Sequence, residues 1–245
     1  MAVAIKMKLN EKLFLRDPQE TKLGRKIIQY SILMIDEKGF EDFTFKKLAD
    51  RIESTEASVY RYFENKHRLL LFLLSWYWEW IKYSIDLKVM NIEDPKRKLK
   101  IALETLVDTS HHDNPETEHI NEAILHRIVI AESAKGYYTK QVDEENQQGL
   151  FLTYKALCQT FHTIMLEINP SFPYPRALAS TILEMAKSHV YFSEHLPSLT
   201  DINFKKGNSE SQVKQLLIDF AFGLLGSTQF AAKPENGQLE HKILI

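Results

Sequence analysis

Hydrophobic residues recur at intervals of three or four along most of the chain, and this is the spacing of one face of an α-helix. No run alternates apolar and polar residues as a half-buried strand does. The pattern predicts about nine helices, over residues 24–38, 45–52, 56–63, 67–90, 96–110, 116–135, 137–169, 176–195 and 209–226. The expected fold class is therefore all-α.

One stretch, from Thr44 to Lys66, reads TFKKLADRIESTEASVYRYFENK. Thr44 stands just before the first of two short helices, where its hydroxyl can accept a hydrogen bond from a free backbone N–H group. A polar break at residues 53–55 precedes the second helix, which carries Val59 and Phe63 four positions apart. Two short helices joined by such a turn form a helix-turn-helix, and its second helix can enter the major groove of DNA.

The second of these helices is expected to show an unusual outer face. With Val59 and Phe63 turned inward, helical spacing places small, polar and aromatic residues outside or on the flanks. These residues are Ala57, Ser58, Tyr60, Arg61 and Tyr62. Small residues let the backbone approach base edges, while tyrosine hydroxyls and an arginine can reach phosphates.

Residues 40–70 resemble the DNA-binding domain of the TetR family of bacterial repressors, most specifically from Tyr60 to Lys66. The resemblance is carried by Gly39, Phe40, Thr44, Leu48, Ala49, Ser58, Val59, Tyr60, Tyr62, Phe63, Asn65, Lys66, Leu69 and Leu70. The remainder of the chain is similar to the family only in being helical and of suitable length. The family usually has glycine in the turn, where this chain has Glu53, and a positive φ at Glu53 would cost about 1 kcal/mol.

The resemblance implies a three-helix DNA-binding domain, joined by a long helix to a C-terminal domain that binds an effector and dimerises. It implies a repressor that binds a pseudo-palindromic double-stranded DNA operator and is released by a small-molecule effector. The domains implied are an N-terminal arm (1–23), a helix-turn-helix domain (24–66), an effector-binding and dimerisation domain (67–230) and a tail (231–245).

The positions that match the family's motif are expected to contact DNA. Thr44 and Lys66 would hold phosphates from either side of the motif, and Glu56 can accept a hydrogen bond from a cytosine amino group. The full set is Thr44, Glu56, Ala57, Ser58, Tyr60, Arg61, Tyr62 and Lys66.

The helices at 176–195 and 209–226 each carry an apolar stripe, and the resemblance implies that they pair with their copies in a homodimer. Small residues that permit close helix approach are Ala177, Ala179, Ser180, Ala186, Gly223 and Gly226. The alternative is that both stripes only close the core of the monomer. A second alternative concerns the lysine-rich arm, which either lies along DNA or is a frayed, solvated tail.

Composition says more about the cellular compartment of the protein than about its function. The chain has 245 residues and a net charge of −2, which a DNA-binding protein with only a local basic surface can tolerate. One cysteine excludes an internal disulfide and suits a reducing cytoplasm. No signal peptide is visible, and the longest apolar run, residues 69–78, is too short to span a membrane.

Other chemistry is weakly indicated. His119, Glu122 and His126 fall on one helical face and suit a metal site, but a solvated polar face explains them better because no metal-binding motif is present. Cys158 and His162 lie one turn apart, yet a lone cysteine in an apolar helix is usually inert. No catalytic motif and no cofactor motif is present, so we do not expect an enzyme.

A cavity in the C-terminal domain is a further expectation. The aromatic residues available to line it are Tyr137, Tyr138, Phe151, Tyr154, Phe161, Tyr191 and Phe192, and each of them also suits plain core packing. The competing hypothesis for the whole chain is a helical small-molecule-binding protein, or an enzyme, that retains the fold without reading DNA. Use of the helix-turn-helix as a protein-docking surface is a third.

Overall fold

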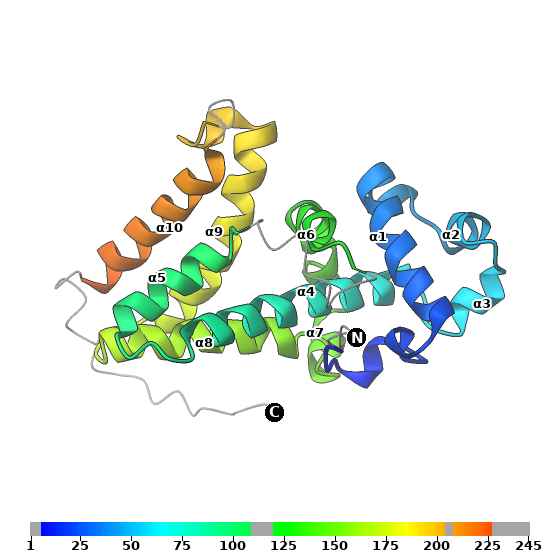
Figure 1. Ribbon diagram of the computed structural model, residues 1–245, viewed down its shortest axis with the longest axis horizontal. Helices are drawn as coiled ribbons and strands as arrows, with labels where there is room; N and C mark the ends of the chain where they lie inside the picture. The colour runs from blue at the N-terminus through cyan, green and yellow to red at the C-terminus, as the bar shows by residue number, and fades with distance from the viewer. Residues whose placement is uncertain (1–5, 109–119, 204–207, 227–245) are drawn as a thin grey trace.

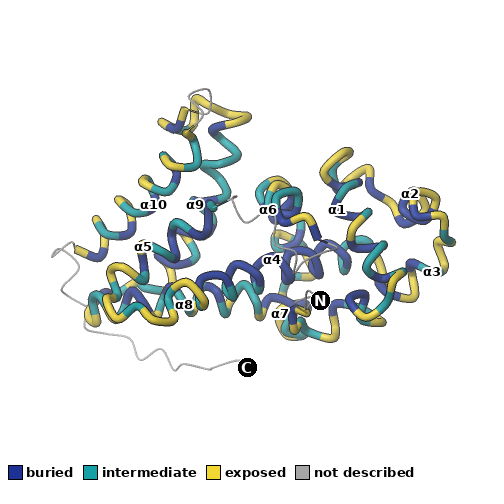
Figure 2. The backbone as a smooth tube through the Cα atoms, viewed as in Figure 1, coloured by how far each residue is buried: buried dark blue, intermediate teal, exposed yellow. Residues whose placement is uncertain are grey.

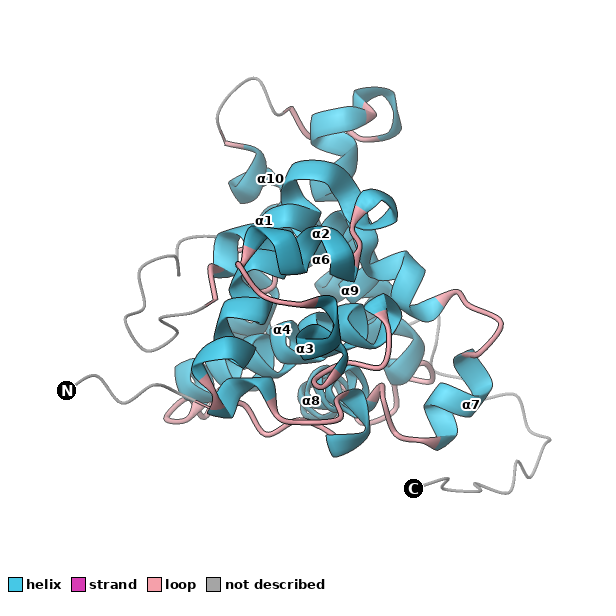
Figure 3. Ribbon diagram, turned by 90° about the vertical axis from the view of Figure 1, so that its right-hand side faces the viewer, coloured by secondary structure: helices cyan, strands magenta, loops and turns pink. Residues whose placement is uncertain are grey.

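The computed structural model describes residues 6–108, 120–203 and 208–226. Within these residues the protein is built from ten α-helices and short 3-10 turns, with no strand (Figures 1 and 3). No helix in this part of the chain is long and apolar enough to cross a membrane. His119 and the tail predicted at 231–245 lie outside the described residues.

Three helices at one end of the molecule form the N-terminal domain (Figure 1). α1 is broken near its end at Gly39, whose φ of 78° is left-handed, which agrees with the predicted stop. Thr44 caps the next helix as predicted, because its hydroxyl oxygen accepts a hydrogen bond from the backbone N–H of Lys47 at 3.3 Å. The bounds are α1 Lys22–Asp42, α2 Phe45–Arg51 and α3 Glu56–Tyr60.

α4 (Lys66–Val89) runs from this domain into the rest of the molecule, close to the predicted bounds (Figure 1). Most of the helix is buried (Figure 2), because its sequence is apolar nearly all round. Trp76, Trp78 and Trp80 are no more than 5% exposed, so core packing accounts for all three.

The remaining helices form the C-terminal domain around α4. α6 packs against both α1 and α4, α8 packs against α4, α5 and α9, and α10 covers α9. Their bounds are α5 Pro95–Thr105, α6 Glu122–Tyr137, α7 Val142–Gln147, α8 Leu152–Ile168, α9 Pro175–His195 and α10 Ser209–Leu225.

The prediction of one helix over 137–169 is wrong, because two helices, α7 and α8, occupy this stretch. The chain reverses at Gly149, whose φ is 77°. The predicted stop before Gly136 is also wrong, since α6 continues to Tyr137. A Cβ atom at Gly136 would lie 2.5 Å from Leu74 Cδ1, so this glycine permits close packing of α6 on α4.

The described part of the N-terminal arm is packed on the body and is not a frayed tail. Met7 and Leu13 are buried, and Asn10 Nδ2 donates to the carbonyls of Gln148 and Gly149 at 3.0 and 2.9 Å. Further along, the backbone N–H of Leu15 donates to the carbonyl of residue 62 at 2.8 Å. The arm thus connects the DNA-binding motif to the turn between α7 and α8.

Candidate nucleic-acid interface

α3 presents an exposed face opposite a buried one. Val59 is fully buried, whereas Glu56, Ala57, Tyr60 and Arg61 are exposed and Ser58 is half-buried. The Tyr60 ring stands edge-on to the ring of Phe45, with 5.0 Å between centroids, so its orientation is fixed from α2. The exposed set agrees with the helical wheel, and Thr44 is exposed as well.

Tyr62 departs from the prediction that it flanks the exposed face. α3 ends at Tyr60, short of the predicted end at Phe63, so helical spacing no longer governs the following residues. Tyr62 is only 3% exposed, its hydroxyl lies 2.8 Å from Thr21 Oγ1, and the Arg16 guanidinium carbon lies 5.6 Å from its ring centroid. The phenol therefore ties the arm and the start of α1 to the motif.

Lys66 also points into the protein. Its ammonium donates to the carbonyls of Phe40, Glu41 and Phe43 at 3.0, 2.9 and 3.3 Å and lies 4.7 Å from the Phe40 ring centroid. A cation at these carbonyls satisfies the C-terminal end of α1. Because three donors meet three acceptors, a phosphate on Lys66 would have to replace one of these bonds.

The turn between α2 and α3 contains a strained residue at the position where the resembled family usually has glycine. Glu53 has a φ of 55°, the only positive φ of a non-glycine residue among the described positions. Its side chain is exposed, so no contact in the turn demands a glutamate. The turn nevertheless keeps the two helices in contact, with α2 packed on α3.

α6 of the C-terminal domain holds the end of α1 through polar side chains. Glu132 Oε1 accepts a hydrogen bond from the backbone N–H of Phe40 at 3.0 Å, at a buried position. Arg127 binds both oxygens of Asp36, at 3.0 and 2.7 Å, and these hydrogen bonds raise the pKa of the guanidinium. The stretch from α1 to α2 is thus held by Glu132 on one side and by Lys66 on the other.

Comparison with known proteins identifies this motif. A family model described as "Bacterial regulatory proteins, tetR family" matches residues 27–72, which include α2, α3 and the start of α4. Residues 27–72 therefore form a TetR-type helix-turn-helix domain. No curated protein matches it in sequence. The predictions of an all-α fold and of a TetR-type helix-turn-helix near the N-terminus are confirmed.

Solved structures share the fold. AibR in complex with isovaleryl coenzyme A and operator DNA has a TM-score of 0.53 and 13% sequence identity, over 80% of this chain and 97% of that chain. The superantigen PfiT has a TM-score of 0.56 and 12% identity, over 83% of this chain and 97% of that chain. At such identities the likeness concerns the fold alone.

Aromatic side chains pack together where α4, α6, α8 and α9 meet in the C-terminal domain. Tyr137 and Tyr154 stack with 5.3 Å between centroids, and Tyr154 Oη donates to Glu184 Oε1 at 2.9 Å. Lys187 pairs with Glu184 at 2.9 Å and lies over the rings of Trp78 and Tyr137. The cavity described beside this cluster measures only about 10 Å³, so Tyr137 and Tyr154 serve as core, whereas Tyr138 is 79% exposed.

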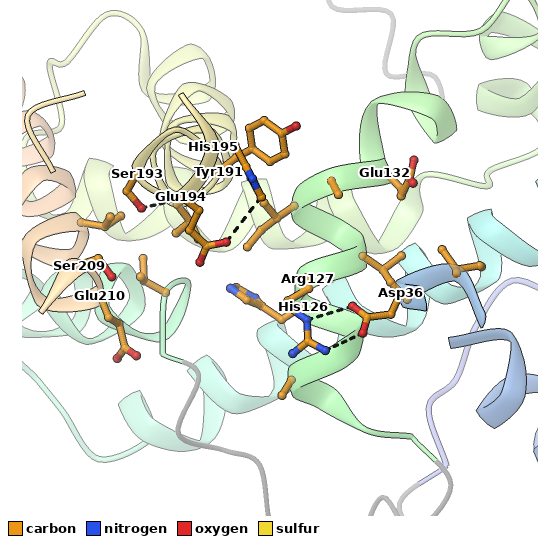
Figure 4. Close-up of a pocket in the computed structure, with 18 of the residues that line it drawn as sticks. Asp36, His126, Arg127, Glu132, Tyr191, Ser193, Glu194, His195, Ser209 and Glu210 are labelled. Atoms are coloured by element: carbon orange, nitrogen blue, oxygen red, sulfur yellow. Dashed lines mark hydrogen bonds and ion pairs between the residues drawn. The ribbon is translucent and has the colours of Figure 1, made fainter. Parts of the chain in front are cut away.

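A larger opening lies between the two domains. The cleft encloses about 680 Å³ and is lined by α1, α6, α9 and α10 (Figure 4). Of the aromatic residues predicted to line a cavity, Tyr191 is the one that lines this cleft. The cleft has no local sequence signal, because its lining comes from α1, α6, α9, α10 and Val107, which lie far apart in the chain.

The structure gives the other candidate residues different roles. His126 Nδ1 lies 2.6 Å from the hydroxyl of Tyr77, and no group of three or more potential metal ligands occurs among the described residues. Burial raises the pKa of the Cys158 thiol to about 11, so the thiol stays protonated at neutral pH. His162 lies 2.9 Å from Gln159 Nε2 and has no hydrogen bond to Cys158.

Proposed function

We propose that this protein is a homodimeric transcriptional repressor that binds a pseudo-palindromic operator through α3 and is released by a small-molecule effector. The observation that carries the proposal is the exposed face of α3 within a domain that matches the TetR family. AibR, which shares the fold, is described in complex with operator DNA and a coenzyme A ester. A role in transcription requires no catalysis and places the protein with the bacterial DNA in the cytoplasm.

We assign direct DNA contacts to the exposed residues of the motif. Small side chains at the start of α3 allow close approach to base edges, and the tyrosine and arginine at its end reach bases or phosphates. The direct set is Thr44, Glu56, Ala57, Ser58, Tyr60 and Arg61. Tyr62 and Lys66, also assigned from the sequence, support this surface from behind by holding α1 and its end in place.

Two copies of the chain would present two such helices to successive turns of the DNA. α10 supports a dimer because it carries two apolar faces. One face, with Val213 and Leu217, is buried against the monomer, whereas Phe220 and Leu224 are 52% and 36% exposed. Nothing lies within 4 Å of a Cβ atom built at Gly223, so a partner helix can approach the backbone there.

Removal of the Tyr60 hydroxyl group tests the proposed DNA contact. Tyr60→Phe keeps the ring that packs on Phe45 and removes only the hydroxyl, so we expect about fivefold weaker operator binding with unchanged stability. Tyr138→Phe is the matched control, because Tyr138 is 79% exposed and lies outside the motif. Binding is measured at two salt concentrations on the DNA upstream of the gene and on a random fragment.

The outcome separates the proposal from its competitor. A protein that retains the fold without reading DNA predicts no preference for any sequence, even after selection from random DNA. That result would overturn the proposed function. Selected sequences with two half-sites, together with a loss on Tyr60→Phe alone, would support a dimeric operator-binding protein.

A further inference from the structure

The cleft between the domains has the size and lining of a ligand site. One wall comes from α1 and α6, with Ile35, Asp36 and Arg127, and the opposite wall comes from α9 and α10, with Val190 and Val213 (Figure 4). Its volume of about 680 Å³ falls in the range of pockets that bind small molecules. The apolar side chains on both walls favour an apolar ligand body.

The charges of the cleft favour a cation. Arg127 is already bound by both oxygens of Asp36, so an anionic ligand would have to displace that carboxylate. Glu194 has no ion pair this close: its Oε2 lies 3.7 Å from His195 Nε2, its side chain is 38% exposed, and its charge acts on Arg127 only through space. The other cleft carboxylates are in closer ion pairs, Glu132 with Lys135 and Glu210 with Lys214.

Two aromatic rings belong to the same turn of α9 as this carboxylate. The rings of Tyr191 and His195 lie 4.6 Å apart, and both residues line the cleft with Glu194. Figure 4 shows the Glu194 carboxylate directed toward the space between α9 and α6. A carboxylate and aromatic rings that line one cleft favour a positive charge of low hydration, which a simple metal ion does not offer.

We propose that this cleft binds an amphipathic organic cation, with the positive charge at Glu194 and the apolar body between α6 and α9. The same cleft contains the groups by which α6 holds α1, namely Asp36, Arg127 and Glu132. A bound cation therefore changes the contacts by which α6 holds the end of α1. Through the end of α1 it also changes the position of the helix-turn-helix. This regulatory consequence rests on the proposed function, whereas the binding itself does not.

Two ions of nearly equal shape and opposite charge test the binding. Tetraphenylphosphonium and tetraphenylborate are each titrated into the full-length protein, without DNA, by isothermal titration calorimetry. We expect one tetraphenylphosphonium per chain and at least about tenfold weaker binding of tetraphenylborate. Equal affinity for the two ions would overturn the assignment of a cation site.

Variants locate the site. Glu194→Gln keeps the shape of an exposed side chain and is expected to weaken tetraphenylphosphonium binding about tenfold. Ala131→Trp fills the cleft from an exposed position on α6 and should abolish binding. Glu167→Gln is the matched control, because Glu167 lies on α8 in a shallow groove and is paired with Lys98 at 2.8 Å. A loss on Glu167→Gln alone would place the ion in that groove and overturn the proposal.

A second measurement separates this inference from the proposed function. Tetraphenylphosphonium is added to the protein–operator complex, and its expected effect is weaker DNA binding, with a reciprocal loss of cation affinity on DNA. Cation binding by a protein that binds no operator would overturn the proposed function and leave the cleft assignment intact. Binding of both ligands with no mutual effect would overturn the regulatory part alone.

Discussion

The exposed face of α3 and the turn between α1 and α2 use polar side chains in opposite ways. On α3, Glu56 and Arg61 are exposed to solvent. At the turn, only a few residues away, Lys66 and Glu132 direct their charged groups to buried or partly buried backbone groups of Phe40. A change on α3 therefore alters what the surface can bind, whereas a change at the turn alters the fold that positions the surface.

Two cationic side chains of the motif differ in the same way, although the sequence alone does not distinguish them. Arg61 and Lys66 both fall within the portion that resembles the TetR family. Arg61 follows the last residue of α3 and is exposed, while Lys66 begins α4 and closes the end of α1. Position in a motif thus does not tell whether a cation binds phosphate directly or stabilises the domain that does.

The largest effect is expected at Lys66. Lys66→Ala removes three hydrogen bonds from a charged donor and leaves carbonyls at the end of α1 without a partner, so we expect the free energy of unfolding to fall by about 3 kcal/mol. Urea denaturation measures the change. Lys46→Ala, on the exposed side of α2, is the control and should alter stability by no more than about 0.5 kcal/mol. Weaker DNA binding at unchanged stability would instead assign Lys66 to a phosphate.

The next effect is expected at Glu132. Glu132→Ala leaves the buried N–H of Phe40 unpaired, at a cost of about 2 kcal/mol in the free energy of unfolding. Glu132→Gln keeps an amide oxygen as acceptor and loses only the ion pair to the half-exposed Lys135, so its cost should stay below about 1 kcal/mol. Denaturant titration of the two variants side by side checks this. Equal losses would mean that the negative charge, and not the hydrogen bond, is what matters.

The smallest effect, of opposite sign, is expected at Glu53. Glu53→Gly relieves the left-handed conformation in the turn and should raise the free energy of unfolding by about 0.5 kcal/mol, because part of the gain is lost to the greater entropy of glycine in the unfolded chain. Glu37→Gly, at an exposed helical position of α1, should lower it by about 1 kcal/mol. Thermal denaturation compares the two, and a loss in both variants would contradict the strain at Glu53.

Much of the fold follows from local patterns. The cap at Thr44 is predictable, because a hydroxyl just before an apolar helical run can accept a hydrogen bond from a free N–H group of the first turn. The burial of α4 is predictable, because a helix that is apolar on nearly all sides must be covered by other helices. The break at Gly149 is not predictable in this way, because apolar residues on both sides of it keep helical spacing. Only the left-handed φ of Gly149 reveals the break between α7 and α8.

The chain's own sequence determined the class of the fold, most of the helices and the exposed residues within α3, because these depend on residues within one or two helical turns of each other. Tertiary structure decided the rest. Tyr62 turned inward to Thr21, Lys66 found the carbonyls at the end of α1, and the cleft formed where α1, α6, α9 and α10 meet. Side-chain partners so distant in sequence are fixed by packing, and no local periodicity records them.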